Sequence, residues 1–331
     1  MALSPATSGL TSTDGASRAT PRRSVRGRRW KSLPFYAFIS PWLIGTILLT
    51  AFPLIYAFGV SLTNWDGISP RFRFLGLENY TAVFSSPETW SSLGRTFLLA
   101  GIVVPVTIVG GLLLAIALNQ KVRFRTGFRL LVYLPAIIPP VAATLAWKIL
   151  FDRDNGGFNA FLRLFGIPAV DWLSQGIVFW VLVALLLWGI GAGVLINLAA
   201  LQDVPIELRE AARLDGANSF GVFWHVTLPA ISPVLLFQVI TTTIAVLQTF
   251  IPVLLLSPAT AASSVTAVPE ENQVFMISVY AQYFAYQRYG YASAMLWIFF
   301  ALILLLTFVF FKFSGRVVFY AVDPSAQEGR R

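Results

Sequence analysis

The stretch ELREAARLDGANSFGVFWHVTLPAISP, residues 207–233, lies between two strongly apolar runs and carries the only histidine of the chain. The wider loop 202–228 holds four acidic and two basic residues. By contrast, 56% of the 331 residues are apolar and only 12% are charged, which exceeds the apolar share of a soluble domain. The stretch is therefore a polar insert in a membrane protein.

Six apolar runs are each long enough to cross a bilayer as a helix, for which about 20 residues are needed. Lipid cannot satisfy exposed backbone groups, so a spanning segment is a helix or part of a closed barrel. Barrel strands alternate in polarity over about ten residues, and these runs are continuously apolar. The expected fold is all-α, with spans at 35–62, 96–118, 128–150, 177–201, 229–256 and 292–313.

The 24 Lys and Arg residues alternate with the spans, which explains the net charge of +9 without nucleic acid as a partner. Both tails and the second and fourth loops hold 17 of them, and the three other loops hold six. By the positive-inside rule, these four segments are expected on the cytoplasmic side. We therefore expect a disordered basic tail at 1–34, a membrane domain at 35–320 and a cytoplasmic tail at 321–331.

Several kinds of chemistry lack the residues they need. None of the four lysines lies in a P-loop motif, there is no cysteine, and His225 has no second histidine to share a metal. The middles of the six spans carry no ionisable residue, whereas proton-coupled carriers place such groups inside the bilayer. A non-catalytic transport subunit is favoured, with an ion-coupled secondary carrier and a membrane enzyme as alternatives.

The polar insert has the signals of two short helices joined by a glycine turn. Asp203 or Val204 can cap a helix that begins at Pro205. Gly216 is placed to end that helix in the left-handed conformation. Asn218 or Ser219 can cap a second helix that runs to about Leu228. Small alanines beside the turn would let another protein approach closely.

The pattern EAA-x-x-DGA, followed by Leu-Pro at 228 and 229, resembles the EAA loop of binding-protein-dependent ABC importer permeases. The matching residues are Glu210, Ala211, Ala212, Asp215, Gly216, Ala217 and Pro229. The segments LQDVPIELRE, ENYTAVF and LPAIIPPVAATLAWKILFD narrow the resemblance to the carbohydrate-uptake class, over residues 35–320.

This resemblance implies a permease fold in a bacterial or archaeal cytoplasmic membrane. It also implies a second permease subunit, two ATPase subunits that bind ATP and Mg, and an extracytoplasmic binding protein that delivers a sugar. The chain itself would hold no cofactor. Glu210 would anchor the ATPase, Gly216 would set the angle between the two short helices, and the alanines would form the contact surface. The role of His225 is left unassigned.

A polar stripe on the fifth span is a candidate for the substrate path. Placed 100° apart, its residues fall within an arc of about 120°, and Thr243 lies outside it. Hydrogen bonds between helices are the alternative use of such a stripe. In the fourth span Trp188 can stack on a sugar, while Gly189 and Gly193 permit close helix packing. The stripe consists of Gln238, Thr241, Thr242, Ala245, Gln248, Thr249 and Pro252.

Overall fold

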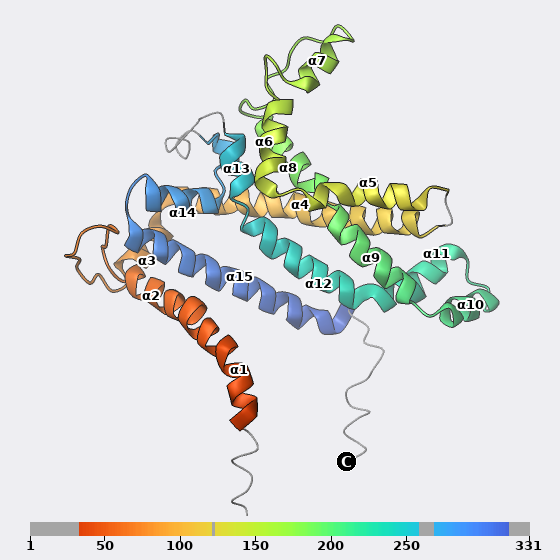
Figure 1. Ribbon diagram of the computed structural model, residues 1–331, viewed down its shortest axis with the longest axis horizontal. Helices are drawn as coiled ribbons and strands as arrows, with labels where there is room; N and C mark the ends of the chain where they lie inside the picture. The colour runs from red at the N-terminus through yellow and green to blue at the C-terminus, as the bar shows by residue number, and fades with distance from the viewer. Residues whose placement is uncertain (1–32, 121–122, 258–267, 318–331) are drawn as a thin grey trace, which may run out of the picture. The chain divides into compact units, whose positions relative to one another are not determined.

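The computed structural model describes residues 33–120, 123–257 and 268–317 (Figure 1). These ranges are mostly helical, and the only β-pairing within them is an isolated bridge between Thr63 and Phe74. The chain divides into two compact units after Ile55. Of the predicted tails, 321–331 lies outside the described residues, and so does 1–34 except for its last two residues, which already belong to a helix.

The first unit contains α1 (Leu33–Thr46), the π-helical segment η2 (Ile47–Ala51) and the start of α2 (Phe52–Ser61). With the rest of α2, these segments form a 27-residue apolar helix, Phe35–Ser61, at the place of the predicted first span. None of the residues in the most apolar 18-residue segment of this helix is buried within the protein. Large exposed side chains such as Phe38 and Leu49 suit a helix whose solvent is lipid.

The second unit contains the remaining spans. The described residues include five helices long and apolar enough to cross a membrane, or six if one bent pair counts as a span. The second span is α4 (Pro87–Asn119). It begins earlier than the predicted residue 96, because the Ser86 side chain accepts a hydrogen bond from the Thr89 amide and Pro87 suits a first turn.

The predicted third span, 128–150, consists of two helices bent by 98° rather than one continuous helix. They are α5 (Arg125–Ile137) and α6 (Pro140–Leu150). Ile138 and Pro139 lie between them with extended backbones. Each of these two residues precedes a proline, which disfavours the helical conformation.

The fourth span, Val178–Asp203, is interrupted after Trp188 and consists of α8 (Val178–Trp188) and α9 (Gly191–Asp203). The fifth differs from the predicted 229–256 at both ends. It runs without a break from α11 (Ser219–Val222) through the π-helical η3 (Phe223–Thr227) to α12 (Leu228–Leu247). After Leu247 the helix stops, and α13 (Ile251–Leu256) follows as a separate piece.

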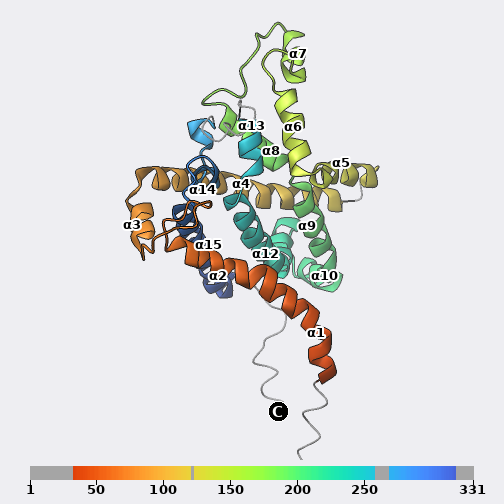
Figure 2. The ribbon, with the colours of Figure 1, turned by 60° about the vertical axis from the view of Figure 1, so that its left-hand side comes forward.

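Figures 1 and 2 show α4, α9, α12 and the last span, α15 (Tyr289–Val317), packed as a bundle that α6 leaves at a steep angle. The short helix α7 (Gly157–Arg163) lies at the far end of α6. One core cluster joins α4, α8, α15 and α14 (Phe275–Phe284), and includes Leu99, Leu182 and Phe275. A second joins α4, α9 and α12 through Ala115, Val194 and Ile231.

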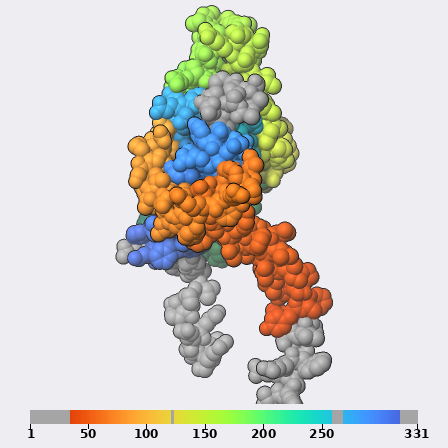
Figure 3. Space-filling model, turned by 90° about the vertical axis from the view of Figure 1, so that its left-hand side faces the viewer, coloured from red at the N-terminus to blue at the C-terminus, as the bar shows by residue number. Residues whose placement is uncertain are grey.

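The loop after α2 closes one end of this unit. Asn79, in α3 (Glu78–Ser85), donates from Nδ2 to the carbonyls of Ser61 and Thr63 at 2.8 and 2.7 Å. The Gly290 amide of α15 donates to the Trp65 carbonyl. In Figure 3 this loop and α3, in orange, lie beside α14, in blue.

Candidate functional site

The predicted coupling loop, 202–228, contains a helix that ends at a glycine. This helix is α10 (Ile206–Leu214). The amide of Ala217 donates to the Ala212 carbonyl, and the amide of Gly216 to the Arg213 carbonyl. This pair of bonds is the Schellman motif, which satisfies the last carbonyls of a helix. Gly216 has a φ of +89°, a conformation that costs a residue with a side chain about 1–2 kcal/mol.

The two helix starts in this loop differ in how they are capped. Pro205 occupies the position before α10, which has no side-chain cap, so the predicted capping by Asp203 or Val204 is wrong. At α11 the Asn218 side chain accepts a hydrogen bond from the Gly221 amide at 2.8 Å. Of the two predicted candidates, Asn218 is therefore the cap and Ser219 is the first helical residue.

The matched EAA residues form a projecting surface beyond the ends of α9 and α12 (Figure 1). Glu210, Ala211 and Asp215 are exposed, while Ala212 and Ala217 are half-buried. His225 is also exposed, and its Nδ1 lies 3.0 Å from the Gly221 carbonyl oxygen. The arrangement offers carboxylates and small side chains to a partner on one surface.

The second coupling helix does not end near Leu228 as predicted, but continues into the fifth span. Pro229 lies just after the π-helical turn, where the Leu228 amide donates to the Phe223 carbonyl, five residues back. Because proline has no amide hydrogen and its ring crowds the preceding turn, a wider turn accommodates it. A movement of α11 therefore acts on α12 without an intervening loop.

The predicted polar stripe does not form one continuous face. Gln238 is 5% exposed, and its Nε2 donates to Asn197 Oδ1 of α9 at 2.7 Å. Gln238 therefore makes a hydrogen bond between helices, which was the alternative to a role in the substrate path. Thr249 is also buried, at 8% exposed.

The exposed part of the stripe is shorter than predicted. Thr241 and Ala245 are exposed on α12, and Thr242 is half-buried. Gln248 is exposed at the break beyond Leu247, and Pro252 belongs to α13, so neither continues the face of α12. Thr241 and Thr242 thus remain on the helix, with Gln248 at its end.

In the fourth span, Gly191 permits a closer approach of a neighbouring helix than Gly189 or Gly193 does. A Cβ at Gly191 would collide with the Val132 carbonyl of α5. One at Gly193 would lie 3.3 Å from Gln238 Oε1, which fits its predicted packing role. Gly189 instead lies exposed in the break after α8.

Trp188 is 37% exposed, and its ring centroid lies 5.9 Å from that of Trp147 in α6. Trp147 in turn contacts Phe151, at 5.2 Å between centroids. The indole of Trp188 is therefore the accessible end of an aromatic row. Trp147 was not predicted to be near Trp188, because the contact depends on the bend between α5 and α6.

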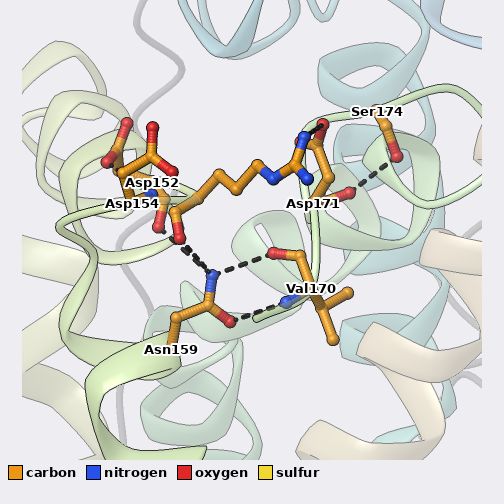
Figure 4. Close-up of polar contacts among 7 residues, drawn as sticks. Asp152, Asp154, Asn159, Val170, Asp171 and Ser174 are labelled. Carbon is orange, nitrogen blue, oxygen red and sulfur yellow. Dashed lines mark hydrogen bonds and ion pairs between the residues drawn. The ribbon is translucent and has the colours of Figure 1, made fainter. Parts of the chain in front are cut away.

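Asn197 and Asn159 were also missed. Asn197 is fully buried, and its Nδ2 has no hydrogen-bond partner among the described residues. Asn159 is fully buried in the lobe around α7, where its Oδ1 accepts from the Val170 amide and from Trp172 Nε1, at 3.1 and 2.9 Å. Its Nδ2 donates to the carbonyls of Arg153 and Val170 (Figure 4). A lone amide inside an apolar run was the available signal for Asn197.

Within the described ranges, no three acidic or histidine side chains are close enough together to hold a metal ion. The described surface features that suit a function are thus the projecting loop and the polar break between α12 and α13.

The comparisons with known proteins agree with this arrangement. The family described as binding-protein-dependent transport system inner membrane component matches residues 107–325. The probable ABC transporter permease protein YesP of Bacillus subtilis is 33% identical over 93% of this chain and 97% of its own length. The trehalose/maltose transport system permease protein MalF of Thermococcus litoralis is 31% identical, over 84% of this chain and 92% of its own.

The fold is also found among solved structures. A chain of a bacterial ABC transporter involved in the import of alginate has a TM-score of 0.75 and 22% identity, and the match covers 88% of this chain and 99% of that one. The relatives are permeases, which are transport components rather than enzymes. The chain belongs to the family of inner membrane components of binding-protein-dependent transport systems, the permease subunits of ABC transporters.

Proposed function

We propose that this permease forms half of the path by which an ATP-driven importer carries a sugar or oligosaccharide across the cytoplasmic membrane. The substrate class rests on the trehalose/maltose permease relative, which aligns over most of both chains. It is consistent with the groups near the helix break. Thr241 and Gln248 present a hydroxyl and an amide, and Trp188 presents an aromatic face. These are the groups that pair with and stack on sugars.

The observation that carries the coupling role is the shape of the coupling loop. It projects beyond two spans, it is closed by Gly216 in a left-handed conformation, and its second helix is continuous with the fifth span. In our proposal this loop docks on a separate ATPase subunit, with Glu210 as the polar anchor and Ala211, Ala212 and Ala217 against the partner. Nucleotide-driven movement then passes directly into α12.

The complete transporter would contain a second permease, two ATPase subunits and an extracytoplasmic binding protein. ATP and Mg would bind to the ATPase, so this chain needs no cofactor. The coupling loop and both chain ends would face the cytoplasm, as the distribution of Lys and Arg favours. Uptake that requires ATP and the binding protein would separate this proposal from ion-coupled transport.

Replacing Gly216 by valine tests the coupling role. A Cβ at Gly216 would meet open space, so the effect of Gly216→Val comes from the backbone alone. We expect the variant to insert normally but to lose substrate-stimulated ATPase activity in the reconstituted complex. Full stimulation would refute the role.

Gly166→Val is the matched control. Gly166 also has a positive φ, of +73°, and open space around its Cβ, but it lies in the lobe after α7, far along the chain from the loop. It therefore introduces the same kind of strain without touching the proposed docking surface. Equal loss of stimulation in both variants would assign the effect to strain in general.

The substrate path has its own test. Thr242→Val and Gln248→Leu remove a hydroxyl and an amide that the structure leaves accessible or partly so. We expect each to weaken uptake affinity or change selectivity in vesicles that contain the complete transporter, while basal ATPase activity is kept. Unchanged uptake by both variants would remove these residues from the path.

A further inference from the structure

A basic hollow lies between the coupling loop and the ends of α4 and α9. It has a volume of about 250 Å³, many times the roughly 10–15 Å³ that a single water needs. The end of α4 contributes Asn119 and Gln120, α10 contributes Arg209 and Arg213, and α11 contributes Ser219. None of the described residues that line it is acidic.

The two arginines share one face of α10. They are four residues apart, so their side chains lie one above the other, and like charges at this spacing repel. On the same helix Glu207 lies about 160° away from Arg209 around the axis, at 100° per residue. Glu210 lies only about 60° from Arg213, but it does not line the hollow and forms no ion pair with either arginine among the described residues.

The guanidinium groups also have unused hydrogen-bonding capacity. Arg209 donates from Nη2 to the Val204 carbonyl at 2.7 Å, while its Nε is buried without an acceptor among the described residues. Arg213 makes no hydrogen bond or ion pair with any residue that the structure describes. A buried donor without a partner is costly, and an anion in the hollow would supply the acceptor.

We propose that this hollow binds a phosphate group, as an anionic lipid headgroup or as a free phosphate. Arginine forks match phosphate oxygens in pairs, and Ser219 and Asn119 add neutral donors at the rim. The hollow lies where the spans α4 and α9 end, and the ends of membrane spans lie near the depth of the lipid headgroups. The apolar lining, Ile116, Leu201 and Phe223, suits the start of the acyl chains of a lipid. Basic pockets between spans are known to take anionic headgroups.

The test uses the full chain in a neutral detergent and follows its thermal unfolding midpoint. One arm titrates inorganic phosphate against chloride at equal ionic strength, and the other titrates short-chain phosphatidylglycerol against phosphatidylcholine. We expect a saturable rise in the midpoint in at least one arm. A rise with the lipid alone identifies a headgroup site, and a rise with both identifies a site for phosphate itself.

Arg213→Gln should weaken this binding at least tenfold. Arg213→Lys keeps the charge but loses the forked guanidinium, so its affinity should lie between those of the wild type and Arg213→Gln. Arg123→Gln is the matched control, because it removes one exposed positive charge that does not line the hollow. It should bind like the wild type.

Three results would overturn the proposal. They are no saturable rise with either probe, unchanged binding in Arg213→Gln, and an equal loss in Arg123→Gln and Arg213→Gln. If the natural occupant of the hollow is an acidic segment of a partner protein rather than a phosphate group, we expect the first of these results. Because the assay needs neither a sugar nor an ATPase, its outcome is independent of the proposed transport function.

Discussion

Replacing Gln238 by leucine separates the structural and the substrate-facing residues of the fifth span. Gln238 is bonded to Asn197 between α12 and α9, where both side chains are buried. Two glycines leave room for the pair. A Cβ at Gly193 would lie 3.3 Å from Gln238 Oε1, and one at Gly111 would lie 3.5 Å from Asn197 Nδ2. The pair thus ties α9, α12 and α4 together.

The expected cost follows from what Gln238→Leu leaves behind. Asn197 Nδ2 already has no partner among the described residues, and the substitution also removes the donor to its Oδ1. A buried polar group left unpaired costs about 1–3 kcal/mol. Measured hydrogen bonds between membrane helices average about 0.6 and reach about 1.7 kcal/mol. We therefore expect Gln238→Leu to lower the free energy of unfolding by about 1–2 kcal/mol.

The double variant Asn197→Leu/Gln238→Leu removes both buried amides. It should cost less than the sum of the two single variants, because no orphaned group remains. The assay is unfolding of the full chain in mixed micelles of increasing denaturing-detergent content, followed by tryptophan fluorescence. Thr241→Val is the control, since Thr241 is exposed and bonds only within its own helix, and it should change stability by less than about 0.5 kcal/mol.

A Gln238→Leu variant as stable as the control would refute the reasoning, as would strict additivity in the double variant. The two outcomes have different meanings. Wild-type stability would mean that the Asn197 amide finds other partners. Additivity would mean that the two amides act independently, despite the 2.7 Å between Gln238 Nε2 and Asn197 Oδ1.

Three further predictions concern other parts of the chain. Asn159→Ala unpairs the main chain of the lobe and Trp172 Nε1, so we expect trypsin to cut the lobe at least tenfold faster; an unchanged rate would contradict this. Gly191→Ala should destabilise the chain by about 1–3 kcal/mol in the mixed-micelle assay, because its Cβ meets the main chain of α5, whereas Gly127→Ala, with open space around it, should not. Hydrogen bonds from Ser69 lower the pKa of Asp66 from 3.8 to about 2. The stabilisation of this loop is therefore present above about pH 4 and is lost as the pH falls through about 2, which tryptophan fluorescence followed against pH should show. A fluorescence transition centred near pH 4, or one that persists in Asp66→Asn, would contradict this.

The coupling loop was predictable because its signals are local. Gly216 and Asn218 form or permit hydrogen bonds that involve residues within five positions of themselves, so a short window of sequence contains both the capping residue and the helix end that it caps. The apolar runs were equally visible, since their length alone indicates a span. The family pattern at 210–217 added the function that the runs by themselves did not indicate.

The bend between α5 and α6 also had a local signal, which the count of apolar residues overrode. Pro139 and Pro140 follow each other inside the predicted span, and proline disfavours a helical residue before it. A run can be apolar throughout and still contain two helices. Backbone chemistry, not hydrophobicity, decides where it bends.

The end of α12 at Leu247 had no comparable signal. Neither Gln248 nor Thr249 breaks a helix strongly, and Pro252 comes five residues after Leu247, where the helix stops. The break is instead set by packing, because α13 lies against α6 and the Lys148 Nζ of α6 donates to the Ser257 carbonyl just after α13. The partner helix is about a hundred residues earlier in the chain, so no window of sequence contains both.

The two ends of the fifth span correspond to the two proposed roles of this chain, coupling to an ATPase and passage of a sugar. From Ser219 to Leu247 the helix is continuous, roughly 40 Å at 1.5 Å per residue, so a displacement of α11 is carried along its length. Asn197 bonds it at Gln238 to α9, which enters the same coupling loop from the other side, so both arms of the loop move together. The helix ends at the break at Gln248, where the last carbonyls of α12 lose their helical partners. If the proposed coupling is correct, movement and accessible polar groups meet at that break, and we propose that a sugar is bound and released there.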